Sequence, residues 1–192
     1  ISTPIGRLDC TPCKPRPPGV VSVGYDKALS FTACLMKRIY LAGPDVFHPD
    51  AAERAEAHKA LCLQSGFEPL HPIDQPTLTA AHIYRTNLAM LRQADAVLAN
   101  FNPFRGAEVD SGTAFEVGFA IALGKPVIGY LADAESLHDR VGRLFGPLNV
   151  RDGIPYDCHG DLVENFGHPV NLMLAESCQI VIGDFNAALK QL

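Results

Sequence analysis

Short runs of apolar residues recur along the chain from residue 38 onward, and more polar segments separate them. Each run has the length of a β-strand. The first is followed by Gly43 and Pro44, two residues that favour a turn. The runs predict strands at residues 39–42, 67–70, 95–100, 127–130 and 179–182.

The segments between these runs have the spacing of amphipathic helices. Residues 49–65 are rich in alanine and stop before Gly66, while residues 79–94 direct Ile83, Leu88 and Leu91 toward a core. Further helices are predicted at residues 111–123, 137–145 and 184–192, with a helix start within residues 167–176. Strands that alternate with helices are typical of an α/β protein, here a doubly wound, five-stranded parallel sheet with helices on both faces.

The first 36 residues differ from the rest of the chain. They are rich in proline and glycine and have neither a helical nor a strand period. We therefore expect an irregular N-terminal extension at residues 1–36, or an accessory segment laid over the surface, and one folded domain at residues 37–192.

Composition excludes several classes of protein. The 192 residues carry a net charge of −5, and no basic patch of the kind that binds nucleic acid is present. No apolar run approaches the roughly 18 residues of a membrane span, and no secretory signal is recognisable. We expect a cytoplasmic protein that binds neither nucleic acid nor a membrane.

Six cysteines are present, and two of them, Cys10 and Cys13, have a spacing seen in redox and zinc sites. No second pair or nearby histidine completes a metal site. We expect the other four cysteines to be reduced, as is usual in the cytosol.

Residues 95–130 form the most informative unit, because they predict a strand, a polar loop, a helix and a second strand in succession. Small molecules bind such sheets where loops leave the carboxyl ends of the strands. Two carboxylates, Asp110 and Glu116, lie at this junction between loop and helix.

Glu116 has two interpretations. Residues 113–116 (T-A-F-E) fit a capping box, in which the acid hydrogen-bonds the free amides at the start of a helix. Alternatively, the carboxylate is a catalytic group of the loop it adjoins. The two roles do not exclude each other.

Other chemistries lack their motifs. No G-x-G-x-x-G follows the first strand, no P-loop sequence occurs, and the seven histidines lack metal-binding spacing. The remaining candidates for chemistry are the two carboxylates, Asp110 and Glu116, together with Tyr40 on the neighbouring predicted strand. A tyrosine hydroxyl beside a carboxylate suits a nucleophile that attacks a sugar carbon through an oxocarbenium-like transition state, and leaves Asp110 to bind sugar hydroxyls.

Four motifs in register resemble the nucleoside 2-deoxyribosyltransferase family. They are residues 40–44 (Y-L-A-G-P), 110–118 (D-S-G-T-A-F-E-V-G), 124–126 (G-K-P) and 171–173 (N-L-M). The resemblance covers essentially residues 38–192. It implies a flavodoxin-like fold and the transfer of 2-deoxyribose between nucleobases through a covalent sugar–glutamate intermediate, with net retention of configuration.

The resemblance also implies roles for single residues. Glu116 corresponds to the nucleophile, Tyr40 to the tyrosine that hydrogen-bonds it, and Asp110 to the acid that binds sugar hydroxyls. Phe47 matches an aromatic residue of the base pocket, and the motif glycines Gly43 and Gly112 are expected to line the substrate site.

Asn171 and Met173 match residues that reach the sugar end of a neighbouring subunit's site. The resemblance therefore implies a homo-oligomer, at least a dimer, with shared sites. Its substrates would be a 2′-deoxyribonucleoside and a free nucleobase, as in nucleotide salvage, and no metal or organic cofactor would be needed.

The sequence departs from the family at the position of Asn87, where some members carry a base-contacting aspartate. Asn87 can bind a base edge but cannot protonate it. Asp74 is the candidate for assisting the leaving base. The N-terminal extension has no counterpart in the family.

Three alternatives remain. One is a hydrolase on the same scaffold, a deoxynucleoside 5′-monophosphate N-glycosidase, although Asp110 would repel a phosphate placed beside it. Another is a phosphoribohydrolase, whose P-G-G-x-G-T-x-x-E loop this chain matches only from Gly112 onward. The third is a nucleotide-binding protein without catalysis, in which Glu116 only caps a helix.

Overall fold

The computed structural model describes residues 36–72 and 79–192. These described residues belong to one compact unit. The expectations for the N-terminal extension, for Cys10 and Cys13 and for Asp74 fall outside the described residues. The boundary between residues 36 and 37 therefore stays a prediction.

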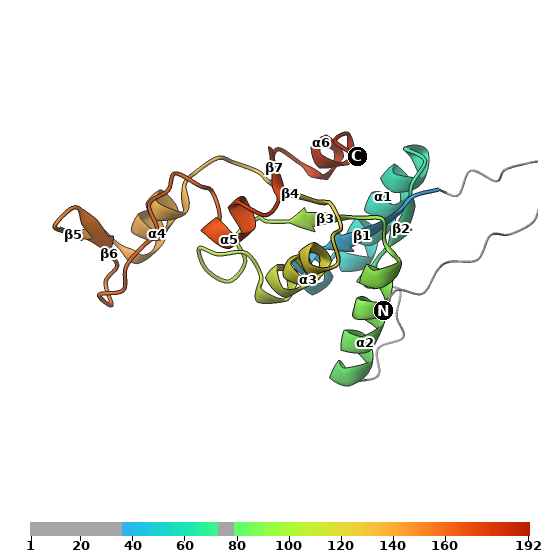
Figure 1. Cartoon of the computed structure of the whole chain (residues 1–192), viewed down its shortest axis with the longest axis horizontal. Helices are drawn as coiled ribbons and strands as arrows, with labels where there is room; N and C mark the ends of the chain where they lie inside the picture. Colours follow the sequence, from blue (N-terminus) through green and yellow to red (C-terminus); the bar gives the residue numbers. More distant parts are fainter. Residues whose placement is uncertain (1–35, 73–78) are drawn as a thin grey trace, which may run out of the picture. The chain divides into compact units, whose positions relative to one another are not determined.

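Five parallel strands form the central sheet (Figure 1), in the order β2-β1-β3-β4-β7. The strands are β1 (Arg38–Ala42), β2 (Glu68–Leu70), β3 (Ala96–Asn100), β4 (Val127–Leu131) and β7 (Gln179–Ile182). They coincide with the five predicted runs to within a residue. The expected α/β class with a flavodoxin-like, doubly wound sheet is confirmed.

The helices follow the predicted alternation. They are η1 (Pro44–Phe47), a 3₁₀ turn, and the α-helices α1 (Ala51–Gln64), α2 (Ala80–Gln93), α3 (Ser111–Ala122), α4 (Leu137–Phe145), α5 (Leu172–Ala175) and α6 (Phe185–Leu189). Polar side chains cap several of them: Thr79 accepts a hydrogen bond at the start of α2, and Asp184 does so at α6.

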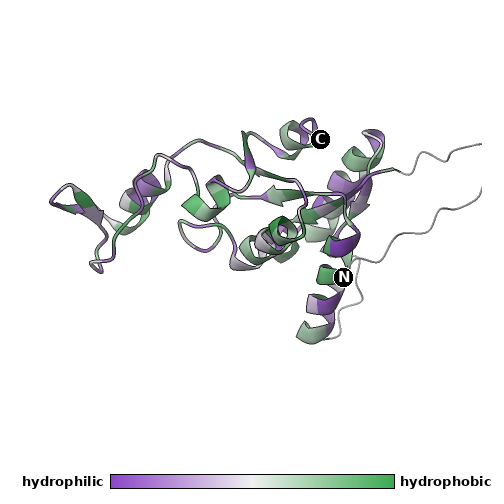
Figure 2. Ribbon diagram, in the orientation of Figure 1, coloured by the Kyte–Doolittle hydropathy of each residue, from purple (hydrophilic) through white to green (hydrophobic). Residues whose placement is uncertain are grey.

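Alternate residues of the strands pack into two apolar layers, one on each face of the sheet. Tyr40 and Ala42 of β1 join the layer beneath α2 and α3, whereas Ile39 and Leu41 join the layer beneath α1 and α6. Figure 2 shows hydrophobic residues along the central strands. This alternation decides that the Tyr40 side chain faces α3.

Neither η1 nor the strands that follow α4 were predicted from the sequence. The segment after α4 contains a small antiparallel hairpin of β5 (Asn149–Arg151) and β6 (Ile154–Tyr156). Both strands are only three residues long, too short for a periodic signal in the sequence. α5 is also shorter than the segment in which a helix start was predicted.

The described cysteines Cys62, Cys158 and Cys178 are free thiols. In the part of the chain that the structure describes, no helix is both long and apolar enough to cross a bilayer.

Candidate active site

A pocket of about 430 Å³ lies at the carboxyl end of β1, next to the first turns of α3. This is the edge of the sheet at which α/β proteins bind small molecules, near the β1/β3 switch point. Six of the predicted site residues line it: Gly43, Phe47, Asn87, Asp110, Gly112 and Glu116.

The Glu116 carboxylate is held by two donors from different elements. The Tyr40 hydroxyl donates to Oε1 over 2.6 Å, and Asn87 Nδ2 of α2 donates to the same oxygen over 3.1 Å. No hydrogen bond from a described residue reaches Oε2. One oxygen thus fixes the orientation of the carboxylate, and the other is left for a ligand.

The environment of Glu116 makes it a weaker acid. Burial raises the pKa of Glu116 to about 7, and the nearby charge of Asp110 also raises it, while the hydrogen bonds from Tyr40 and Asn87 lower it. Burial and the charge of Glu116 raise the pKa of Tyr40, so its hydroxyl stays a donor. A carboxylate with a pKa near neutrality in a pocket is typical of a catalytic group.

Asn87 has an unused acceptor. Its Nδ2 faces Glu116, and its Oδ1 is a buried atom with no hydrogen-bond partner among the described residues. A buried acceptor without a partner is costly, so a ligand that donates an N–H group at this point gains affinity.

Asp110, not Thr113, is the N-cap of α3. Its Oδ2 accepts hydrogen bonds from Thr113 N over 2.9 Å and from Thr113 Oγ1 over 3.1 Å. Glu116 therefore lies in the second turn and bonds to Tyr40 and Asn87 instead of the helix amides. The capping-box interpretation was wrong, because the helix begins earlier than the T-A-F-E pattern indicated.

Phe47 lies at the mouth of the pocket with 56% of its surface exposed. It stacks on Phe104, with ring centroids 5.4 Å apart, and the Arg105 guanidinium lies 5.2 Å from the Phe47 ring. Phe104 and Arg105 were not among the predicted site residues. In the sequence, the only indication of their role was that a phenylalanine is followed directly by an arginine in the loop after a predicted strand.

Gly43 is required by a close approach of two loops. A Cβ at this position would lie 2.8 Å from both Asn100 Cβ and Asp45 Oδ2. Asp45 of η1 is buried and accepts a hydrogen bond from Asn100 Nδ2 over 2.8 Å, which joins η1 to the end of β3. A side chain at position 43 would separate these loops beside the pocket.

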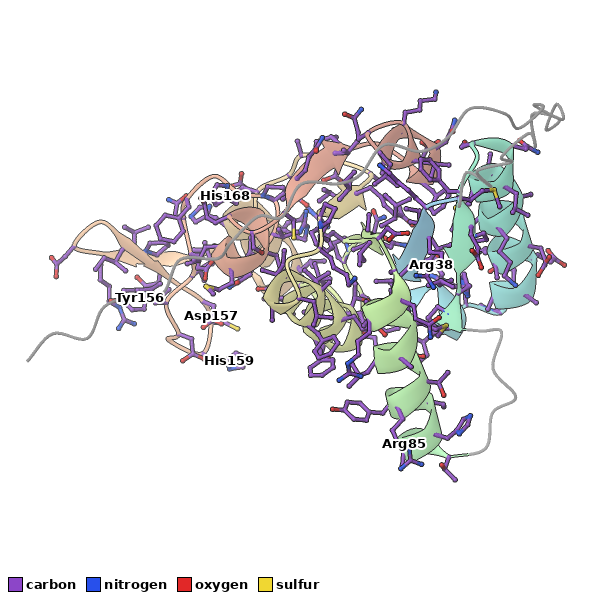
Figure 3. All side chains as sticks on the ribbon, turned by 45° about the vertical axis from the view of Figure 1, so that its right-hand side comes forward. Arg38, Arg85, Tyr156, Asp157, His159 and His168 are labelled. Atoms are coloured by element: carbon purple, nitrogen blue, oxygen red, sulfur yellow. The ribbon has the colours of Figure 1, made fainter. Side chains whose placement is uncertain are left out.

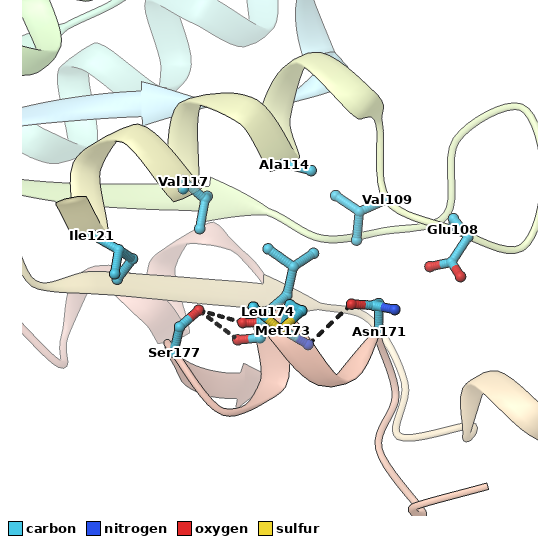
Figure 4. A pocket seen from close by; sticks show the side chains of 10 residues that line it. Glu108, Val109, Ala114, Val117, Ile121, Asn171, Met173, Leu174 and Ser177 are labelled. Carbon is cyan, nitrogen blue, oxygen red and sulfur yellow. Dashed lines mark hydrogen bonds between the residues drawn. The ribbon is translucent and has the colours of Figure 1, made fainter. Parts of the chain in front are cut away.

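Asn171 and Met173 do not belong to this pocket. They line a second cavity, of about 510 Å³, between α3 and α5 (Figure 4). Asn171 Oδ1 caps α5 by accepting from Met173 N over 3.0 Å, and 71% of the Met173 surface is exposed. Within one chain these residues do not meet Glu116.

Residues 36–72 and 79–192 contain no evident metal-binding site. In these ranges no three or more His, Cys, Asp or Glu side chains are grouped so that they could hold an ion.

Replacing Tyr40 by phenylalanine is expected to lower kcat/KM for the reaction at Glu116 by roughly ten- to hundredfold, the worth of one hydrogen bond to a charged group. Steady-state kinetics would measure the change. Tyr156→Phe, on β6 and away from the pocket, is the matched control. An unchanged rate for Tyr40→Phe would mean that its hydroxyl does not serve the carboxylate.

The pH dependence should follow Glu116. If its carboxylate is the reacting form, kcat/KM rises with pH through an apparent pKa of about 7 and is lost below it. Tyr40→Phe should move this limb to higher pH, because the hydrogen bond lowers the pKa. Asp110→Asn should move it to lower pH, because the Asp110 charge raises the pKa. Shifts of the same sign would contradict the assignment.

Comparison with known proteins identifies relatives of this chain. The sequence model of the family "Nucleoside 2-deoxyribosyltransferase" matches residues 39–173. A solved 2-desoxiribosyltransferase from Leishmania mexicana is 37% identical with a TM-score of 0.65, and the match covers 81% of this chain and 95% of that chain.

Two further relatives are more distant. An uncharacterized protein from Schizosaccharomyces pombe is 30% identical over 113 residues. That match covers 54% of this chain and 54%, about half, of the relative's length. A CMP N-glycosidase from Clostridium botulinum is 23% identical with a TM-score of 0.41, and the match covers 54% of this chain and 82% of that one.

Proposed function

Because the chain belongs to the nucleoside 2-deoxyribosyltransferase family, we propose that it transfers 2-deoxyribose between nucleobases through a covalent intermediate on Glu116. The observation that carries this proposal is the Glu116 carboxylate in the pocket. One oxygen is held by Tyr40 and Asn87, and the other is free of hydrogen bonds from described residues.

The reaction would take two displacements. In the first, Glu116 Oε2 attacks C1′ of a 2′-deoxyribonucleoside from the face opposite the base. The C1′–N bond breaks, its electron pair leaves with the base, and a glutamyl ester forms. In the second, a ring nitrogen of another base attacks C1′ from the vacated face and loses its proton, which balances the proton that the departed base anion takes up, and the ester C1′–O bond breaks. Two inversions give net retention.

The pocket chemistry supports this sequence of steps. Tyr40 and Asn87 hold Oε1, so the carboxylate is oriented before the sugar arrives. Asp110 lies at the same mouth, where a carboxylate can accept hydrogen bonds from sugar hydroxyls. A 2′-hydroxyl would hinder the development of positive charge at C1′ and would crowd Glu116, so deoxyribose is preferred over ribose.

We propose further that the chain forms homo-oligomers. The outward face of α3 carries no charged side chain: Ser111, Gly112, Phe115, Gly118 and Ala122 are exposed there. An uncharged, partly aromatic helix face is more typical of an interface than of a solvated surface. A partner on this face would lie beside both the pocket and the cavity that Asn171 lines.

Incubation with deoxyinosine, with and without adenine, tests the proposed function. We expect deoxyadenosine to form together with hypoxanthine when adenine is present, and little hypoxanthine without it. Release of hypoxanthine at the same rate in both samples would indicate an N-glycosidase in place of a transferase. Deoxyinosine binding without any product would indicate a protein that binds nucleosides without catalysis.

A further inference from the structure

A glutamate outside the pocket holds Asn171 with both of its oxygens. Glu164 Oε1 accepts a hydrogen bond from Asn171 Nδ2 over 2.7 Å, and Oε2 accepts one from Leu172 N over 2.9 Å. Both are short hydrogen bonds to a carboxylate, a class roughly twice as strong as neutral ones. Glu164 therefore ties down the Asn171 side chain and the first residue of α5 together.

The orientation of the Asn171 amide follows from this contact. A carboxylate accepts only, so the NH₂ group must face Glu164 and the carbonyl must face away. Oδ1 already accepts from Met173 N. A carbonyl oxygen has two lone pairs, so Oδ1 keeps capacity for one more donor, such as a hydroxyl group.

Glu164 is itself fixed by the segment that follows the β5–β6 hairpin. Val163 is buried, and its backbone N donates to Pro155 O of β6 over 3.0 Å. Figure 3 shows Tyr156, Asp157 and His159 along this segment, with His168 near α5.

Buried Arg140 of α4 fixes the chain between Glu164 and Asn171. Its Nη1 donates to Pro169 O over 2.8 Å and to Ala107 O over 3.3 Å. Both α4 and the segment that follows the hairpin thus restrain the part of the chain that carries Asn171.

We infer that Glu164 is a positioning residue for deoxyribosyl transfer: it orients the Asn171 amide so that Oδ1 accepts a hydrogen bond from a sugar hydroxyl in the neighbouring subunit's site. This inference rests on the proposed function and on the shared site. It also assigns a role to the segment after the β5–β6 hairpin, because Glu164 lies in this segment and Val163 bonds back to β6.

Glu164→Gln tests the inference with the smallest change of shape. A glutamine has one acceptor oxygen, so either Asn171 Nδ2 or Leu172 N would face an NH₂ group. We expect kcat/KM for transfer from deoxyinosine to adenine to fall roughly ten- to hundredfold. Glu176→Gln is the control, because this carboxylate lies on the same segment but pairs with His168. It should leave kcat/KM unchanged.

Two further measurements separate positioning from a loss of structure. In an Asn171→Ala background, Glu164→Gln should cause a much smaller loss, because the side chain that it orients is gone and only the contact with Leu172 N is left. The donors 2′,3′-dideoxyinosine and 2′,5′-dideoxyinosine each lack one of the two sugar hydroxyls. For the donor that lacks the hydroxyl bound by Asn171, Asn171→Ala should not lower kcat/KM, and Glu164→Gln should not lower it either. The oligomeric size of Glu164→Gln should match that of the wild type.

The inference would be overturned by wild-type kinetics for Glu164→Gln, or by a loss of equal size with and without Asn171. Either result leaves the proposed function intact as long as the wild-type protein transfers deoxyribose. Absence of transfer in the wild-type protein would instead overturn the proposed function itself.

Discussion

Replacing Glu116 by alanine is expected to lower the rate of deoxyribosyl transfer by about a thousandfold or more, the order of loss seen when a covalent nucleophile is removed. The carboxylate is the group in the pocket with a free oxygen and a pKa near 7. Without it, no ester with C1′ can form. The rate of deoxyadenosine formation from deoxyinosine and adenine measures the effect.

The fold should survive this substitution. Asp110, not Glu116, caps α3, so the helix start keeps its hydrogen bonds in the variant. Glu116→Gln keeps the volume and an acceptor for Tyr40 but removes the negative charge, and it should be equally inactive. Glu56→Ala, on the exposed face of α1, is the control. Near-normal transfer by Glu116→Ala would eliminate the covalent mechanism.

Mixing an impaired variant with an inactive one is expected to restore part of the activity. An Asn171→Ala chain keeps Glu116, and a Glu116→Ala chain keeps Asn171. If each site takes Glu116 from one subunit and Asn171 from its neighbour, a mixed dimer contains one fully native site. In a random mixture of a two-fold dimer, this amounts to at most about one site in four. Transfer activity after subunit exchange measures the recovery.

A matched mixture controls for this recovery. Asp110→Asn and Glu116→Ala both alter the pocket of their own chain, so their mixed dimers contain no native site. That mixture should show no more activity than the average of its components. If the Asn171→Ala mixture also stays inactive although subunit exchange is demonstrated, each site is built within one chain and the shared-site proposal fails.

Among the residues of the site, Glu116 was the easiest to predict from the sequence. Its local pattern fitted a capping box as well as a catalytic group, and the combination with Tyr40, Asp110 and the family motifs favoured the catalytic role. The predicted helix start at residue 111 is confirmed, but the T-A-F-E pattern gave Thr113 as the cap, which is not compatible with that start. The backbone of the loop decided this, and it placed Asp110 at the cap and Glu116 one turn further on.

By itself, the sequence determined the alternation of strands and helices and hence the doubly wound sheet, because local hydrophobic periodicity is written in neighbouring residues. It also supplied the family motifs. Only the tertiary structure brought Tyr40 and Asn87 onto one oxygen of Glu116, across 76 and 29 residues of chain. It likewise joined Glu164 to Asn171. Such contacts depend on strand order and side-chain direction, which local periodicity does not encode.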